Sequence, residues 1–152
     1  MASITEVFNI VDLSDYLIIF DFDDTLIHSD GSIENLGILK ELKTLGVELC
    51  LATRNDLYYI EAKLEEYELT GLFTYIKADY RPKYYQIKHI LYLYKKWNKF
   101  FNQIYFIDDY QPNIEQIQHH LPNVSCLVFG KDVKDISELI NLVCDNRLNT
   151  LD

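Results

Sequence analysis

The sequence predicts an α/β fold, in which a central parallel sheet of about five strands carries helices on both faces. Apolar segments alternate with helical patterns along the whole chain, which is typical of a parallel sheet covered by helices. The first strand, expected at 16–22, contains the consecutive apolar residues 17–20, as a strand buried on both faces requires. The chain has 152 residues, 49% of them hydrophobic, which suffices for one core and is short for two.

The strands are expected where short apolar runs end in polar or turn residues. They lie at 16–22, 47–52, 75–78, 104–107 and 124–129. Residues 1–15 precede the first strand as an N-terminal extension, and a single core domain is expected to span 16–146.

The helices are identified by apolar spacing and by their terminal residues. They are expected at 33–45, 55–67, 82–97, 112–120 and 136–143. Leucines repeat at helical spacing in the first helix, which ends at Gly46. In the second helix, Leu57, Ile60 and Leu64 share one face. Pro82 opens the third helix, because proline is well tolerated in a first turn.

The composition limits the partners that the chain can bind. Its formal net charge of -10 disfavours nucleic acid and anionic membrane surfaces, because like charges repel. Cys50, Cys126 and Cys144 lie far apart in apolar contexts, so we expect reduced, buried thiols. The first residues lack the basic and apolar segments of a secretory signal, and no apolar stretch is long enough to span a bilayer. We therefore expect a cytoplasmic protein without a membrane partner.

An acidic motif follows the first strand, at Asp21-Phe22-Asp23-Asp24-Thr25. Ligands of open α/β sheets bind beyond the carboxyl ends of the strands. Asp21 and Asp23 are two residues apart, so in strand geometry both side chains leave the same face and can share one cation. The alternative for this segment alone is a solvated acidic turn, since Asp is a favoured turn residue.

Three further polar segments occur at expected strand ends or helix starts. They are Ala52-Thr53-Arg54-Asn55, Arg81-Pro82-Lys83 and Ile107-Asp108-Asp109. Together with the first motif they supply what phosphoryl transfer needs: carboxylates for Mg²⁺, a carboxylate nucleophile, and a cation and a hydroxyl that neutralise charge. Alternatives remain open at each position. Thr53 could cap the following helix, Lys77 or Lys88 could replace Lys83, and the two Asp residues could form a turn.

This ordered set resembles the haloacid dehalogenase superfamily of phosphotransferases, whose first motif reads DxDxT. The resemblance implies a Rossmann-like core in which Asp21 is the nucleophile and a metal ligand. It makes Asp23 the general acid and base, with its backbone carbonyl on the metal. It implies that Thr53 binds the phosphoryl oxygens and that Lys83 balances their charge.

The same resemblance implies the remaining ligands and the substrate side of the site. Asp108 matches the acidic metal ligand of the fourth motif, with Asp109 beside it as a ligand or an outer partner. Arg54 and Asn55 are expected to contact substrate, and Asn113 to order the fourth loop. The implied cofactor is Mg²⁺.

The spacing of the motifs leaves no room for a cap domain. About thirty residues separate Asp21 from Thr53, and about thirty separate Thr53 from Lys83, so one helix with its loops fills each gap. Within the superfamily, Ala52-Thr53-Arg54-Asn55 at the second motif and the segment 108–113 at the fourth resemble the small capless magnesium-dependent phosphatases of the protein or acid phosphatase type. This implies hydrolysis of a phosphorylated small molecule, such as a sugar phosphate, or of a phosphoprotein carrying phosphotyrosine.

Two other functions stay open on the sequence. A polynucleotide phosphatase would also have an open site, but it should carry a basic track for the strand backbone. The net charge of -10 disfavours that function. A non-catalytic interaction module that keeps the fold is the other alternative, because filled catalytic positions do not establish turnover.

Overall fold

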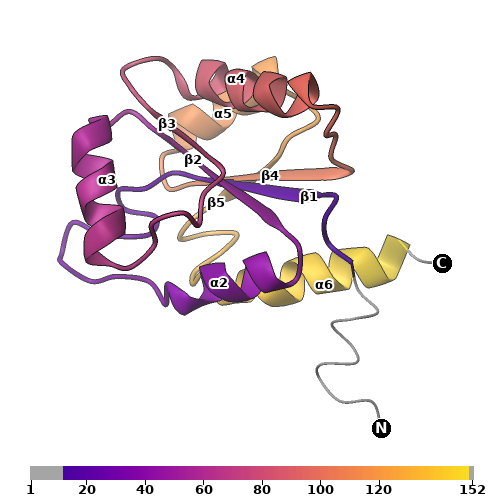
Figure 1. Ribbon diagram of the computed structural model, residues 1–152, viewed down its shortest axis with the longest axis horizontal. Helices are drawn as coiled ribbons and strands as arrows, with labels where there is room; N and C mark the ends of the chain where they lie inside the picture. The colour runs from indigo at the N-terminus through magenta and orange to yellow at the C-terminus, as the bar shows by residue number, and fades with distance from the viewer. Residues whose placement is uncertain (1–11, 151–152) are drawn as a thin grey trace, which may run out of the picture.

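The computed structural model describes residues 12–150 as one five-stranded parallel sheet between two helical layers (Figure 1). The strands are β1 (Tyr16–Phe20), β2 (Glu48–Thr53), β3 (Tyr75–Ala78), β4 (Gln103–Asp108) and β5 (Ser125–Val128). Their order in the sheet is β3-β2-β1-β4-β5, and every neighbouring pair is parallel. The predicted fold class is confirmed, and no cap domain occurs among residues 12–150. Most of the predicted N-terminal extension, 1–11, lies outside the described residues.

Helices cover both faces of this sheet. They are α2 (Gly37–Thr44), α3 (Leu57–Glu66), α4 (Lys83–Lys96), α5 (Gln111–His120) and α6 (Glu138–Thr150). Figure 1 shows α4 and α5 on one face, α2 and α6 on the other, and α3 beside the β3 edge. Within 12–150, none of the helices combines the length and the apolar character needed to cross a membrane.

The alternating side chains of β1 join the sheet to both layers. Ile18 and Phe20 are fully buried in the cluster that includes α2 and α6. Leu17 and Ile19 are equally buried in the cluster that includes α4 and α5. Because both faces of β1 are covered, this strand is fixed at the centre of the sheet. The polar residues that follow it are therefore held at a fixed position.

The first helix begins later than the sequence indicated, at Gly37 rather than at residue 33. Ile33 instead pairs with Ile27 in an antiparallel bridge, and the Glu34 amide donates to the Leu26 carbonyl at 3.0 Å. Backbone groups used in this way are not available to a helix. Residues 22–34 form a folded flap after β1, which apolar spacing alone did not reveal.

A tight turn joins α2 to β2 at Gly46, where φ is +100°. A Cβ at this position would lie 3.1 Å from the Ser14 backbone nitrogen. We expect Gly46→Ala to lower the free energy of unfolding by about 1 to 3 kcal/mol, because strain in the left-handed region adds to the close contact.

Gly71 is the matched control, since its φ is +82° but a Cβ added there would meet nothing within 4 Å. Urea denaturation should show a smaller loss for Gly71→Ala than for Gly46→Ala. Equal losses would mean that the contact with Ser14 contributes nothing.

Candidate active site

A cavity of about 400 Å³ opens at the carboxyl ends of β1, β2 and β4. It is lined by Asp21, Asp23, Thr53, Arg54, Asn55, Lys83, Asp108, Asp109, Tyr110 and Asn113. The structure thus brings every site residue predicted from the sequence to one place. Parallel strands cause this convergence, because their carboxyl ends meet at one edge of the sheet.

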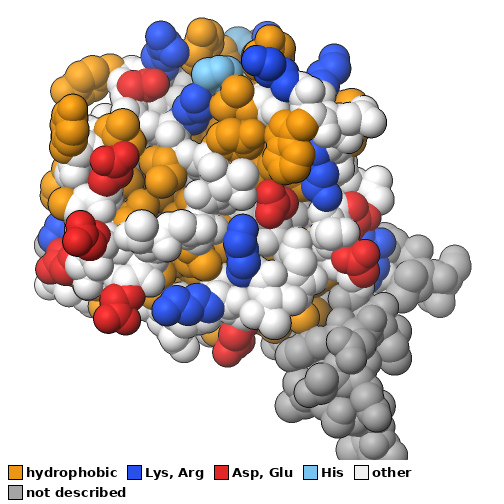
Figure 2. Space-filling view, viewed as in Figure 1, with side chains coloured by type: hydrophobic (Ala, Val, Ile, Leu, Met, Phe, Trp, Pro, Cys, Tyr) orange, Lys and Arg blue, Asp and Glu red, His pale blue; other side chains and the backbone are white. Residues whose placement is uncertain are grey.

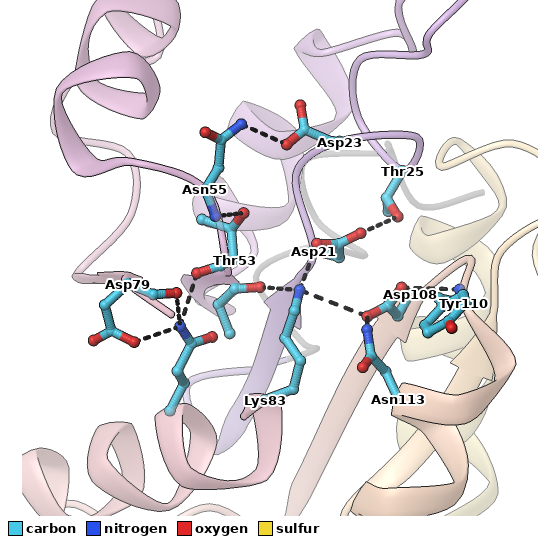
Figure 3. Close-up of polar contacts among 12 residues, drawn as sticks. Asp21, Asp23, Thr25, Thr53, Asn55, Asp79, Lys83, Asp108, Tyr110 and Asn113 are labelled. Carbon is cyan, nitrogen blue, oxygen red and sulfur yellow. Dashed lines mark hydrogen bonds and ion pairs between the residues drawn. The ribbon is translucent and has the colours of Figure 1, made fainter. Parts of the chain in front are cut away.

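Lys83 occupies the centre of the site and is only 3% exposed. Its ammonium donates to Asp21 Oδ1 at 2.5 Å and to the Ala52 carbonyl at 2.6 Å. It also lies 3.6 Å from Asp108 Oδ2 (Figure 3). Lys83 is the first residue of α4, whereas Lys88 is exposed farther along that helix. Of the candidate lysines, Lys83 is therefore the one that faces the carboxylates.

Three carboxylates form a cluster beside this ammonium. Oxygens of Asp21, Asp108 and Asp109 all lie within 4.8 Å of one another. Asp108 is fully buried and accepts hydrogen bonds from the Tyr110 amide and the Asn113 side chain, each at 2.9 Å. Asn113 thereby ties the start of α5 to the end of β4. Hard oxygen donors gathered in this way suit a small divalent cation such as Mg²⁺.

Burial and mutual repulsion raise the pKa values of two of these carboxyl groups. Burial raises the pKa of Asp21 to about 7, with the Lys83 ammonium acting against the shift and the Asp108 charge adding to it. Burial raises the pKa of Asp109 to about 6. The Asp108 carboxylate adds to this shift, because it accepts a hydrogen bond from the protonated form of Asp109 and repels the charged form. Crowded, desolvated carboxylates disfavour their charged forms. A cation shared among them would reverse this preference, which makes the cluster a fitting place for one.

Asp23 is held apart from the cluster by the loop that follows β2. The Asn55 amide donates to Asp23 Oδ2 at 2.8 Å, so Asn55 orients this carboxylate (Figure 3). The Asn55 backbone nitrogen in turn donates to Thr53 Oγ1 at 3.2 Å. Helix α3 is capped by Asp56, which accepts from the Tyr59 amide at 3.2 Å. Thr53 is therefore not the cap of that helix.

Two buried polar residues beside the site were not assigned a role from the sequence. Gln86 donates to the Thr53 carbonyl at 2.7 Å and to Asp79 Oδ1 at 3.1 Å. The Thr25 hydroxyl donates to Asp21 Oδ2 at 3.4 Å. Thr25 belongs to the acidic motif, and Gln86 is a polar residue on the buried face of α4. A polar side chain at an apolar helical position was the available signal for Gln86.

Arg54 and Tyr110 stand at the rim of the cavity. Both line it and both are exposed, Tyr110 to 59%. An exposed cation at the mouth suits an anionic substrate. The contact of Arg54 with substrate stays a prediction, and the structure gives Asn55 a clear partner in Asp23.

Comparison with protein families gives one match. Residues 18–79 match a family described as haloacid dehalogenase-like hydrolase. The matched segment includes the first two motifs and ends before Lys83. No curated protein matches the chain.

Three solved structures resemble the fold. The N-terminal part of a Bacteroides fragilis protein, containing a phosphatase domain complexed with Mg, has a TM-score of 0.64 and 19% identity over 84% of this chain and 39% of its own. A 3-deoxy-D-manno-octulosonate 8-phosphate phosphatase from Moraxella catarrhalis, complexed with magnesium, phosphate and KDO, has a TM-score of 0.56 and 17% identity. The match covers 97% of this chain and 95% of the Moraxella chain. A probable YrbI family phosphatase from Pseudomonas syringae has a TM-score of 0.53 and 14% identity. The match covers 93% of this chain and 90% of the Pseudomonas chain.

The lengths covered differ among these structures. The chain spans less than half of the Bacteroides chain, and nearly the whole of the other two. At these identities the likeness shows the fold, and it agrees with the family match. The family match over 18–79 supports the resemblance inferred from the first two motifs.

The raised pKa of Asp21 predicts how metal binding depends on pH. Below pH 7 a proton on Asp21, whose pKa is about 7, competes with the cation. We expect the apparent dissociation constant for Mg²⁺ to rise about tenfold from pH 8 to pH 6, measured by isothermal titration calorimetry. Asp145→Asn, which changes an exposed acid on α6, should show the same profile. An affinity that does not change between these pH values would remove Asp21 from the ligand set.

Proposed function

We propose that this haloacid dehalogenase-like hydrolase is a Mg²⁺-dependent phosphatase that cleaves phosphomonoesters through an aspartyl-phosphate on Asp21. The observation that carries the proposal is the buried pairing of Asp21 with the Lys83 ammonium, 2.5 Å away, inside a cluster of three carboxylates. A carboxylate in this setting is both fixed in place and surrounded by charge that can offset a phosphoryl group. The catalytic unit is the core domain, 16–146.

Asp21 performs the first chemical step. One carboxylate oxygen attacks phosphorus, an oxygen-phosphorus bond to Asp21 forms, and the bond from phosphorus to the leaving oxygen breaks. Lys83 and Thr25 hold the carboxylate in position. The ammonium of Lys83 and the hydroxyl of Thr53 would meet the phosphoryl oxygens, whose charge must be neutralised during transfer.

Asp23 handles the protons in both steps. In its acid form it gives a proton to the leaving oxygen, and as a carboxylate it then takes a proton from the water that attacks phosphorus. This second attack releases inorganic phosphate and restores the Asp21 carboxylate. The hydrogen bond from the Asn55 amide occupies Asp23 Oδ2. The proton is therefore carried by the other carboxylate oxygen, Oδ1.

The metal site is assigned to the same cluster. Asp21, Asp108 and Asp109 would hold Mg²⁺ together with the Asp23 backbone carbonyl. When bound, the cation neutralises charge on the phosphoryl group and helps to align it with the nucleophile.

The substrate class is a phosphorylated molecule that can enter an uncapped site. The Moraxella catarrhalis neighbour, whose complex contains phosphate and KDO, supports a sugar phosphate. The open cavity with exposed Arg54 and Tyr110 at its rim also supports a phosphate carried on a larger molecule, such as a phosphoprotein. A non-catalytic module is disfavoured, because every residue that the reaction requires lines one cavity.

The nucleophile is tested by Asp21→Asn. We expect this change to reduce turnover of an aryl phosphate by at least about a thousandfold, because an amide cannot form the intermediate, while circular dichroism stays that of the folded protein. Asp24→Asn is the matched control. Asp24 lies outside the cavity, and Asn tolerates its positive φ of 59° and can still accept from the Ser29 amide. More than a few per cent of activity in Asp21→Asn would contradict the assignment.

The proton carrier is tested by Asp23→Asn with leaving groups of different basicity. A basic alkoxide needs the proton, whereas nitrophenolate leaves without it, so we expect kcat to fall about 10²- to 10⁴-fold for alkyl esters. With the nitrophenyl ester, rapid-mixing kinetics should instead show a burst of nitrophenolate, because only the second step is slowed strongly. Equal losses on both esters without a burst would place the acid elsewhere.

A further inference from the structure

The charge of this acidic chain is distributed unevenly. Residues 77–99 contain seven of its 14 Lys and Arg residues and one of its 24 Asp and Glu residues. This segment has a formal charge of +6, and the rest of the chain has -16. Figure 2 shows the consequence: Lys, Arg and His side chains gather over α4, interleaved with hydrophobic ones. A net charge taken over the whole chain conceals this basic surface.

The basic residues of α4 alternate with exposed aromatic rings along one face of the helix. We call this face the α4 stripe; it consists of Arg81, Tyr85, Lys88, Tyr92, Lys95 and Lys96. The spacing of three and four residues places the helical members of the stripe on one side of α4. Arg81 lies in the loop before the helix and joins them through its contact with the Tyr85 ring. The opposite side carries Ile87, Ile90 and Tyr94, which are fully buried in the core. Since α4 has 14 residues, the stripe is about 20 Å long.

The two rings of the stripe remain accessible, with Tyr85 46% and Tyr92 55% exposed. Arg81 lies 5.1 Å from the centre of the Tyr85 ring, and Lys96 lies 5.7 Å from that of Tyr92. A groove of about 320 Å³ lies between the two rings and is lined by Tyr85, Tyr92, Lys88 and His89. Along the helix axis the rings are about 10 Å apart. Arg81 and Lys96 therefore each stand next to a ring, and Lys88 lies beside the groove that the two rings line.

One end of the stripe is close in the sequence to Lys83, which lines the catalytic cavity. Arg81 is two residues before Lys83, whose ammonium contacts Asp21. A chain lying on the stripe would therefore have one end at the loop that leads into the site. The other end of the stripe lies at Lys95 and Lys96, at the opposite end of α4 from that loop.

We infer that the α4 stripe binds single-stranded nucleic acid and presents its terminal phosphate to the Asp21 site. This inference rests on the proposed phosphatase function. Cations suit the phosphates of the strand, and interleaved rings suit its bases, each of which has a face that can stack. An acidic peptide would use the cations but would leave the two exposed rings without a role. The expectation that nucleic acid is disfavoured, which came from the net charge, is revised by the position of the charges.

Binding is tested with a fluorescently labelled 12-nucleotide single-stranded DNA that has no terminal phosphate. Anisotropy at increasing NaCl concentration should show affinity that falls with salt. Lys88→Glu should weaken binding at least about fivefold and lower the salt slope by about one. The matched control is Lys40→Glu, an exposed lysine on α2 on the opposite face of the sheet, which should bind like the wild type.

The rings are tested in the same assay. Tyr92→Ala should weaken binding about fivefold or more, since stacking on one base is lost. Tyr58→Ala, which removes a ring that is 81% exposed on α3, should have no effect. Equal losses in the stripe and control variants would overturn the inference. It would also be overturned if the wild type bound an acidic phosphopeptide and not the oligonucleotide.

Hydrolysis separates this inference from the proposed function. With a 5′- or 3′-phosphorylated 12-nucleotide strand, Tyr92→Ala should lower kcat/KM about fivefold or more, while aryl phosphate hydrolysis stays at the wild-type rate. Aryl phosphate turnover without oligonucleotide binding would overturn the nucleic-acid surface and leave the phosphatase standing. Stripe-dependent binding without turnover of any phosphomonoester would support the surface and overturn the proposed function.

Discussion

The contact of the Lys83 ammonium with the carboxylates of Asp21 and Asp108 is the interaction on which the site depends. These three charged groups are almost completely buried, and isolated charges in such a place would be costly. They are tolerated because they compensate one another, and because the Ala52 carbonyl and the Asn113 amide satisfy further hydrogen bonds. The excess of carboxylate over ammonium that remains is what a divalent cation would balance.

The sheet makes this contact possible by its topology. The three groups come from different elements, with Asp21 after β1, Lys83 at the start of α4 and Asp108 at the end of β4. Because β1 lies between β2 and β4, their polar carboxyl ends are neighbours. Both faces of helix α4 have a role. Its buried face places Lys83 and Gln86 at the site, and its exposed face carries the α4 stripe. One helix thus connects the chemistry with the surface proposed to bind the substrate.

Sequence reasoning located the site because its chemistry is concentrated at strand ends. Asp21, Thr53 and Asp108 each follow an apolar run, and parallel strands bring such ends together. It assigned no role to Gln86, because the polar side chain on an apolar helix face is a weak signal and the contact with the Thr53 carbonyl is tertiary. It placed a helix at residue 33 because apolar spacing does not reveal the bridge to Ile27. The net charge could not predict the α4 stripe for a related reason, since an average over the chain says nothing about which face carries each sign.

The nucleophile is tested most sharply by identifying the residue that carries the phosphoryl group during turnover. The protein would be quenched in acid while it hydrolyses a phosphomonoester with Mg²⁺, any acyl phosphate reduced with borohydride, and the modified peptide identified by mass spectrometry. We expect the modification on Asp21, and we expect it to be absent without substrate. Modification of another residue, or none in a protein that is turning over, would contradict an aspartyl-phosphate mechanism centred on Asp21.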